Sequence, residues 1–174
     1  MSGSLHEIHY GNKGKAVPYW QLFYHIVWST RDREPRITPN VEPIIYDFLR
    51  AKAFGLGGIV YALNGMADHV HLVASVPPKI ALSTFIGQVK GVTTAKYNKL
   101  VAPDHPIYWQ QEYGVFSFDR KRLPAVVAYV DRQKQHHAAR DVIPVLECDS
   151  EEPSTPIAEL PVYYGDFQEL RDLL

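Results

Sequence analysis

Residues 59–78 read IVYALNGMADHVHLVASVPP, and they combine strand and turn signals within 20 residues. Two short runs within it, at 59–63 and 70–76, are rich in β-branched and other apolar residues, which is typical of strands. An Asn-Gly pair, a strong turn signal, follows the first run, and two prolines end the second. The segment therefore predicts two neighbouring strands joined by a short connection.

Further elements lie on both sides of this pair. They are expected as a strand at 22–28, a helix at 43–53, a helix at 82–97, a short β-arm at 107–109 and 114–118, and a helix from 122 to about 137. The resulting order of strand, helix, strand, strand, helix, strand, helix fits a ferredoxin-like α+β fold. In that fold a split βαβ arrangement packs helices against an antiparallel sheet.

The composition bounds the class of protein. A chain of 174 residues with 13 Pro and 11 Gly is expected to form one globular domain with tails. Its one cysteine, Cys148, excludes a disulfide framework or a cysteine-rich metal site within one chain. The sequence shows no run of about 18 apolar residues and a polar start, so a soluble intracellular protein with no membrane partner is expected.

The net charge of −1 at first argues against a nucleic-acid partner. However, residues 1–140 carry a balance of +7 from Lys, Arg, Asp and Glu, and residues 141–174 carry −8. This asymmetry predicts three parts. They are a flexible lead-in at 1–18, a basic domain at 19–140 and an acidic, proline-containing C-terminal tail at 141–174.

His69 and His71 lie at the start of the second strand in this stretch. Side chains two residues apart on a strand project from the same face, so both imidazoles point one way. Two imidazoles make half of a metal site, although such a pair alone is more often structural. Further ligands are needed to complete it.

The last predicted helix supplies candidates. At 3.6 residues per turn, Tyr129, Gln133 and His136 share one strip along the margin of its apolar face. A tyrosine at such a margin is commonly a core residue whose hydroxyl reaches the surface. Gln133, one turn further on, weakens that interpretation because a partly covered amide needs a bonding partner.

The motifs occur together in a characteristic order: DHVHL at 68–72, KG at 90–91, YVDRQ at 129–133 and HH at 136–137. Over roughly residues 20–140 this order resembles the small single-tyrosine transposases of the HUH endonuclease superfamily. These are the proteins of the simplest bacterial insertion sequences and of their repeat-associated relatives.

The resemblance implies a role for each matching residue. His69 and His71 would hold a divalent ion, Mg²⁺ or Mn²⁺, against the scissile phosphate, and Gln133 would complete the metal shell. Tyr129 would be the nucleophile. His136 and His137 match a frequent histidine pair of unassigned, accessory role, which also suits the cation-favouring end of a helix.

The implied reaction is cleavage and rejoining of DNA. A metal on a non-bridging oxygen relieves the charge that protects a phosphodiester from attack. Attack by the phenol conserves the bond energy in a 5′-phosphotyrosine link and leaves a free 3′-OH, so rejoining needs no ATP.

The resemblance also implies a partner, single-stranded DNA with an imperfect hairpin. Basic clusters of the body could contact its phosphates, although each alone is more often a solvated face. These candidates are Arg31, Arg33, Arg36, Lys90, Arg120, Lys121 and Arg122.

Family members of the insertion-sequence type commonly form dimers that share active sites, and repeat-associated relatives with longer tails act as monomers. The segment 141–174 favours the second type, and we expect it to fold over the basic body and compete with DNA. The implied location is the bacterial cytoplasm, at the nucleoid. Two other functions remain open: a metal-dependent nuclease that uses water as nucleophile, and a non-catalytic RNA- or DNA-binding module.

Overall fold

Strands β2 (Ile59–Gly65) and β3 (His69–Ser75) form the antiparallel pair expected from the sequence. They lie at one side of a four-stranded sheet in the computed structural model, which describes residues 19–102 and 104–150. The predicted lead-in and the segment 151–174 lie outside the described residues.

The sheet has the order β2-β3-β1-β4, with every neighbouring pair antiparallel. Strand β1 (Phe23–Ser29) lies in the middle of the sheet, and β4 (Gly114–Phe118) pairs along its other edge. In this register Val27 of β1 faces both His71 of β3 and Gly114 of β4. This topology confirms the ferredoxin-like α+β prediction.

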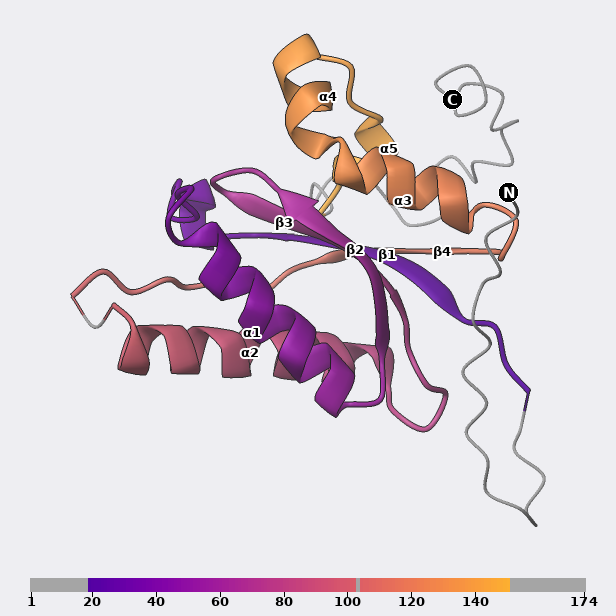
Figure 1. Cartoon of the computed structure of the whole chain (residues 1–174), viewed down its shortest axis with the longest axis horizontal. Helices are drawn as coiled ribbons and strands as arrows, with labels where there is room; N and C mark the ends of the chain where they lie inside the picture. Colours follow the sequence, from indigo (N-terminus) through magenta and orange to yellow (C-terminus); the bar gives the residue numbers. More distant parts are fainter. Residues whose placement is uncertain (1–18, 103, 151–174) are drawn as a thin grey trace, which may run out of the picture.

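Helices cover both faces of the sheet (Figure 1). The first face is covered by α1 (Glu42–Gly55) and α2 (Leu82–Leu100). The opposite face carries α3 (Leu123–Asp131), α4 (Gln133–Ala139) and α5 (Pro144–Glu147). A short 3₁₀ turn, η1 (Arg31–Arg33), follows β1.

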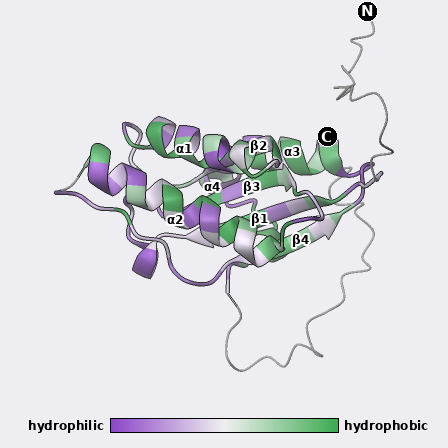
Figure 2. Cartoon of the chain, turned by 90° about the horizontal axis from the view of Figure 1, so that it is seen from below, coloured by the Kyte–Doolittle hydropathy of each residue, from purple (hydrophilic) through white to green (hydrophobic). Residues whose placement is uncertain are grey.

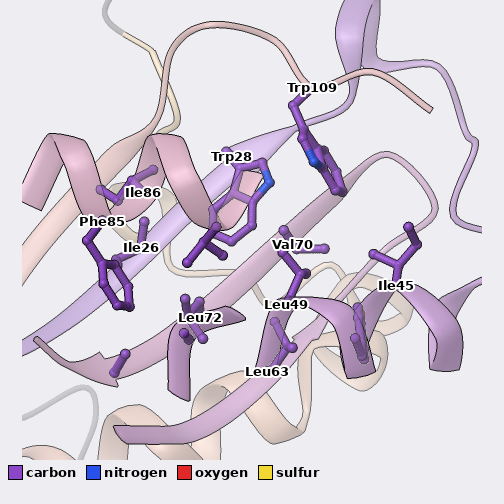
Figure 3. Close-up of a cluster of buried hydrophobic side chains, with 14 of the residues drawn as sticks. Ile26, Trp28, Ile45, Leu49, Leu63, Val70, Leu72, Phe85, Ile86 and Trp109 are labelled. Carbon is purple, nitrogen blue, oxygen red and sulfur yellow. The ribbon is translucent and has the colours of Figure 1, made fainter. Parts of the chain in front are cut away.

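The larger hydrophobic core fills the space between the sheet and helices α1 and α2 (Figure 3). Val70 and Leu72 of β3 point into it beside Trp28 of β1, and Phe85 of α2 packs against them. Both helices carry hydrophobic and hydrophilic residues in alternating bands, as amphipathic helices do (Figure 2).

The alternation of strand residues directs the predicted metal ligands to the other face. Because Val70 and Leu72 belong to the larger core, His69 and His71 face the side of α3, α4 and α5. A smaller apolar cluster lies there, in which Val73 of β3 meets residues of α3 and α5. The polar site is therefore built beside this second core.

Two expectations about elements were wrong in detail. The helix predicted from 122 to about 137 is two helices, because Arg132 leaves helical geometry with φ −101° and ψ 16°. The β-arm is only half formed: residues 114–118 are strand β4 of the main sheet, as the expected order requires, but residues 107–109 form no strand, and Trp109 makes only an isolated bridge to Thr30.

Residues 141–150 lie against the domain, although the sequence assigned them to the tail. Leu146 of α5 is buried in the smaller apolar cluster, and Asp149 is also buried. Among the described residues, no helix is long and apolar enough to cross a membrane.

Candidate active site

His69 and His71 present the same ring nitrogen, Nε2, to one space on the face of α3, α4 and α5. The Nδ1 atom of His69 lies 2.8 Å from the Asp68 carboxylate, and Nδ1 of His71 lies 2.9 Å from Nε2 of His25. These partners fix the ring orientations, as the outer partners of metal-binding histidines do. Both histidines are buried, at 4% and 0% exposure.

The turn before β3 places His69. The amide of Met66 donates to the carbonyl oxygen of His69 at 2.9 Å, which closes the turn between the two strands. A Cβ at Gly65 would overlap that same carbonyl oxygen. The turn therefore requires glycine at this position.

Tyr129 and Gln133 come from opposite sides of the break at Arg132. Tyr129 lies near the end of α3, and Gln133 is the first residue of α4; both are fully buried. His136 stacks on the Tyr129 ring, with 4.8 Å between ring centroids. The amide of Asn64 on β2 donates to the carbonyl of Asp131 at 2.9 Å, which holds the end of α3 to the sheet.

Glu147 of α5 contacts the candidate nucleophile through one carboxylate oxygen. The Tyr129 hydroxyl donates to Glu147 Oε1, and the Gln133 amide donates to the same oxygen at 3.2 Å. The Tyr129 hydroxyl in turn accepts from the backbone amide of Ile143 at 3.1 Å. Tyr129 is therefore enclosed by the segment that leads into and through α5.

The other oxygen of Glu147 lies among three imidazoles. Glu147 Oε2 is 3.2 Å from Nε2 of His71, 3.3 Å from Nε2 of His137 and 3.5 Å from Nε2 of His69. One carboxylate thus connects the predicted nucleophile with the predicted metal ligands. All of these groups belong to one chain.

The charges of these groups depend on one another. Burial opposes charge on His69, but hydrogen bonds to Asp68 and Glu147 raise its pKa to about 9. Burial lowers the pKa of His71, and burial together with the Glu147 hydrogen bond raises that of Tyr129. Burial opposes ionisation of Glu147, but hydrogen bonds to the two strand histidines hold its pKa well below the usual range.

The donor set fits a divalent cation. The atoms predicted to bind it, Nε2 of His69, Nε2 of His71 and Oε1 of Gln133, are all buried. Gln133 Oε1 has no hydrogen-bond partner among the described residues, and the two imidazole nitrogens face only the Glu147 carboxylate, at 3.5 and 3.2 Å. Such lone pairs are costly to bury unless something binds them. Ligand atoms of His69, His137 and Glu147 also lie within 4.8 Å of one another.

The candidate DNA-binding residues fall into two groups. Arg31, Arg33, Arg36 and the run 120–122 are exposed. Several have partners within the chain: Arg33 pairs with Asp68 and Asp149, Arg36 pairs with Glu34, and Arg31 lies over the ring of Tyr108.

Lys90 differs from the exposed arginines. Its side chain is buried, and its ammonium donates to the backbone carbonyls of Gln111 and Glu112 at 3.2 and 2.9 Å. These contacts give it a structural role, in which it fixes the loop before β4.

Sequence reasoning missed Glu147 and His25. No spacing rule connects a residue of α5 with a motif on β3, and the acidic composition after residue 140 favoured a solvated tail. His25 lies in an apolar strand pattern, where a lone histidine carries no signal for function. His137 was considered, but only as an accessory residue or a helix-end cation.

Comparisons with known proteins agree with the motif order. The family model described as "Transposase IS200 like" matches residues 18–133. The ISDra2 transposase TnpA of Deinococcus radiodurans is 33% identical over 84 residues, which are 48% of this chain and 59% of that protein. The transposase for insertion sequence element IS200 of Salmonella typhimurium is 28% identical over 79 residues, 45% of this chain and 52% of that protein. The chain thus spans slightly more than half the length of these curated relatives.

Two solved structures share the fold. One is the crystal structure of a transposase-like protein from Deinococcus radiodurans R1, with a TM-score of 0.54, 24% identity and coverage of 69% of this chain and 97% of that one. The other is a REP-associated tyrosine transposase bound to a REP hairpin, with a TM-score of 0.53, 13% identity and coverage of 83% and 95%.

The match to the family model extends from the residues before β1 to Gln133. It therefore includes the strand that carries His69 and His71 and the helix that carries Tyr129. The chain belongs to the family of IS200-like transposases.

Proposed function

We propose that the chain cleaves and rejoins single-stranded DNA through attack of Tyr129 on a phosphodiester. One observation carries this proposal: the Tyr129 hydroxyl and the Nε2 atoms of His69 and His71 reach the two oxygens of a single carboxylate. The gap between nucleophile and imidazoles is therefore about the width of one small anionic group. A phosphate placed there would meet both.

His69, His71 and Gln133 would hold the divalent ion, Mg²⁺ or Mn²⁺. When bound, the ion offsets charge on a non-bridging phosphate oxygen and orients the group for attack. The burial of these three ligand atoms supports this assignment, as does the anionic Glu147 carboxylate, which lies against the two imidazole nitrogens. Asp68 and His25 would keep the two imidazoles turned toward the ion.

Tyr129 would supply the covalent step. Its oxygen forms a bond to phosphorus as the bond from phosphorus to the 3′-oxygen breaks, and the departing oxygen takes up a proton as a 3′-OH. The 5′-phosphotyrosine then undergoes the reverse attack by a 3′-OH, which restores the DNA and the free phenol. Burial and the hydrogen bond to Glu147 raise the pKa of Tyr129. Ionisation of the phenol would therefore require additional positive charge close to its oxygen.

The proposed substrate is single-stranded DNA with a hairpin, as in the REP hairpin held by one structural neighbour. The exposed arginines of η1 and the basic run 120–122 before α3 would contact its phosphates. Because nucleophile and histidines meet within one chain, we propose that each protomer cleaves with its own Tyr129, whether or not it dimerises. The bacterial cytoplasm, where the nucleoid lies, is the proposed location.

Incubation of the full chain with a labelled library of single-stranded hairpins and Mn²⁺ tests the proposal. We expect a protein–DNA adduct that survives denaturing electrophoresis and disappears in Tyr129→Phe. Tyr46→Phe is the matched control, because Tyr46 is also buried but lies in the core on the other face, with no partner for its hydroxyl among the described residues.

Two outcomes would overturn the assignment. Cleavage that persists in Tyr129→Phe without an adduct would indicate a nuclease that uses water. Binding of the hairpins without cleavage by the unmodified chain, under any divalent ion, would indicate a non-catalytic module.

A further inference from the structure

We propose that Glu147 and His137 are ligands of the same divalent ion, in addition to the residues assigned above. This inference rests on the proposed function, because it extends the metal site that the function requires. It assigns a task to α5 and to the second histidine of the pair at 136–137.

The distances around Glu147 Oε2 are those between ligands that share one ion. Ligand atoms that each lie about 2.0–2.2 Å from a metal are separated from their neighbours by roughly 3.0–3.5 Å. Oε2 lies 3.2, 3.3 and 3.5 Å from Nε2 of His71, His137 and His69. Among these residues, ligand atoms of His69, His137 and Glu147 all lie within 4.8 Å of one another, so a small inward shift of their side chains would let one cation bind all three. His71, whose Nε2 lies 3.2 Å from the same carboxylate, would join them by moving toward that ion.

Neighbouring contacts hold α5 in place, so the position of Glu147 does not depend on its own side chain alone. Leu146 is buried in the smaller apolar cluster. Asp149 accepts from the Ser29 hydroxyl and from the Arg33 guanidinium, the latter at 3.0 Å. These contacts flank Glu147 on both sides in the sequence.

Gly114 of β4 gives α5 its close approach to the sheet. A Cβ at this position would overlap the carbonyl oxygen of Cys148, the residue directly after α5. The edge strand thus leaves room for the segment that carries the carboxylate.

The two adjacent histidines of α4 have different surroundings. The His136 ring stacks on Tyr129. The His137 ring lies 5.0 Å from that of His69, and its Nε2 reaches Glu147. His136 thus supports the nucleophile, and His137 belongs to the cation cluster.

With Glu147 and His137 as additional ligands, the site would bind its metal ion more tightly in the absence of DNA. A carboxylate suits Mn²⁺ and Mg²⁺ better than imidazole does, and it offsets part of the charge of the ion. The free protein would therefore hold its ion without help from phosphate oxygens. Because Oε1 also accepts from Tyr129, an incoming phosphate must replace that hydrogen bond.

Mn²⁺ binding to the full chain in the absence of DNA, followed by electron paramagnetic resonance of the free ion, tests the proposal. We expect Glu147→Gln and His137→Gln each to weaken Mn²⁺ binding by about tenfold or more. Asp141→Asn is the matched control: it removes the same charge from the same segment, its side chain is exposed, and it should leave Mn²⁺ affinity unchanged. Thermal unfolding with EDTA checks that each variant folds, and Glu147→Ala provides a second substitution.

The outcomes separate this inference from the function on which it rests. If His69→Asn abolishes Mn²⁺ binding but neither Glu147 variant changes it, the extended donor set is wrong and the proposed function stands. If Glu147→Gln keeps full Mn²⁺ affinity and forms more DNA adduct, the carboxylate only occludes the site and is not a ligand. If His69→Asn also binds Mn²⁺ normally, the metal centre of the proposed function itself is wrong.

Discussion

His71 depends on two different partners for its two ring nitrogens. Its Nδ1 meets His25, and its Nε2 faces Glu147 and the space for the cation. For Nε2 to offer a lone pair to a metal, Nδ1 must carry the proton and donate it to His25 Nε2. Since a neutral imidazole can either donate or accept at Nε2, His25 can serve His71 in both tautomers. This makes His25 a positioning residue for the metal ligand.

For single residues, the sequence predicted the direction in which a side chain points better than the residues that it contacts. The period of two along β3 placed His69 and His71 on one face, and the structure agrees. The helical spacing of Tyr129, Gln133 and His136 predicted a shared strip, and all three are buried together. Contacts with His25 and Glu147 arise from strand pairing and from the packing of α5, which no local spacing encodes.

Lys90 gives a prediction about pH. Burial lowers its pKa to about 8, well below the value of about 10.4 expected in the unfolded chain. Between these values the unfolded state binds more protons, so this residue makes the free energy of unfolding rise with pH. We expect the unfolding free energy of the unmodified chain, minus that of Lys90→Met, to increase from pH 8 to pH 10 in urea denaturation. A flat or falling difference would show that the ammonium is not desolvated by the fold.

At the scale of elements, α3, α4 and α5 cover one face of the sheet, and α1 and α2 cover the other (Figure 1). The first group packs a small apolar cluster beside the polar site, and the second packs the larger core. The strands could be predicted to within a few residues because β-branched runs and turn residues mark them locally. The break at Arg132 could not be predicted, because the three residues between Tyr129 and Gln133 include no proline or glycine. The geometry of that break is set by packing on the sheet and by the tie between Asn64 and Asp131.

Gly114 provides a prediction for α5. In Gly114→Ala the new methyl group would overlap the Cys148 carbonyl, so the segment after α5 must shift away from β4. We expect a loss of about 1–3 kcal/mol of unfolding free energy, the usual cost of overpacking, together with weaker Mn²⁺ binding.

Gly87→Ala is the control for this prediction. Gly87 lies within α2, and nothing lies near its would-be Cβ, so alanine there should stabilise the chain by about 0.5–1 kcal/mol. Equal effects of the two substitutions in urea denaturation would contradict the proposed close packing of α5 on β4.

On the scale of the whole molecule, the change from a basic to an acidic sequence and the end of the packed domain fall at different residues. Charge changes sign near residue 140, yet packing against the domain continues through Asp149. Two acidic residues of the predicted tail thus contribute to the site: Glu147 enters it, and Asp149 anchors its segment through Ser29 and Arg33. Competition between residues 141–174 and DNA stays a prediction from charge.

The near-neutral total charge had argued against DNA, and the distribution of charge reverses that argument. A sum of charges does not record where each charge lies. In the structure, the Glu147 carboxylate lies among imidazoles. Six of the seven basic residues predicted to contact DNA lie on the surface. Composition could therefore predict a DNA-binding body, but it could not distinguish an acidic tail in solvent from an acidic ligand in the site.

The covalent link between Tyr129 and DNA is the step on which the proposed reaction depends, and its position on the protein can be mapped. After incubation with single-stranded hairpin DNA and Mn²⁺, nuclease and protease digestion followed by mass spectrometry should find the nucleotide remnant on the peptide that contains Tyr129, attached through its 5′-phosphate. A remnant on another residue, or cleaved DNA with 5′ ends free of protein throughout the reaction, would show that Tyr129 is not the nucleophile.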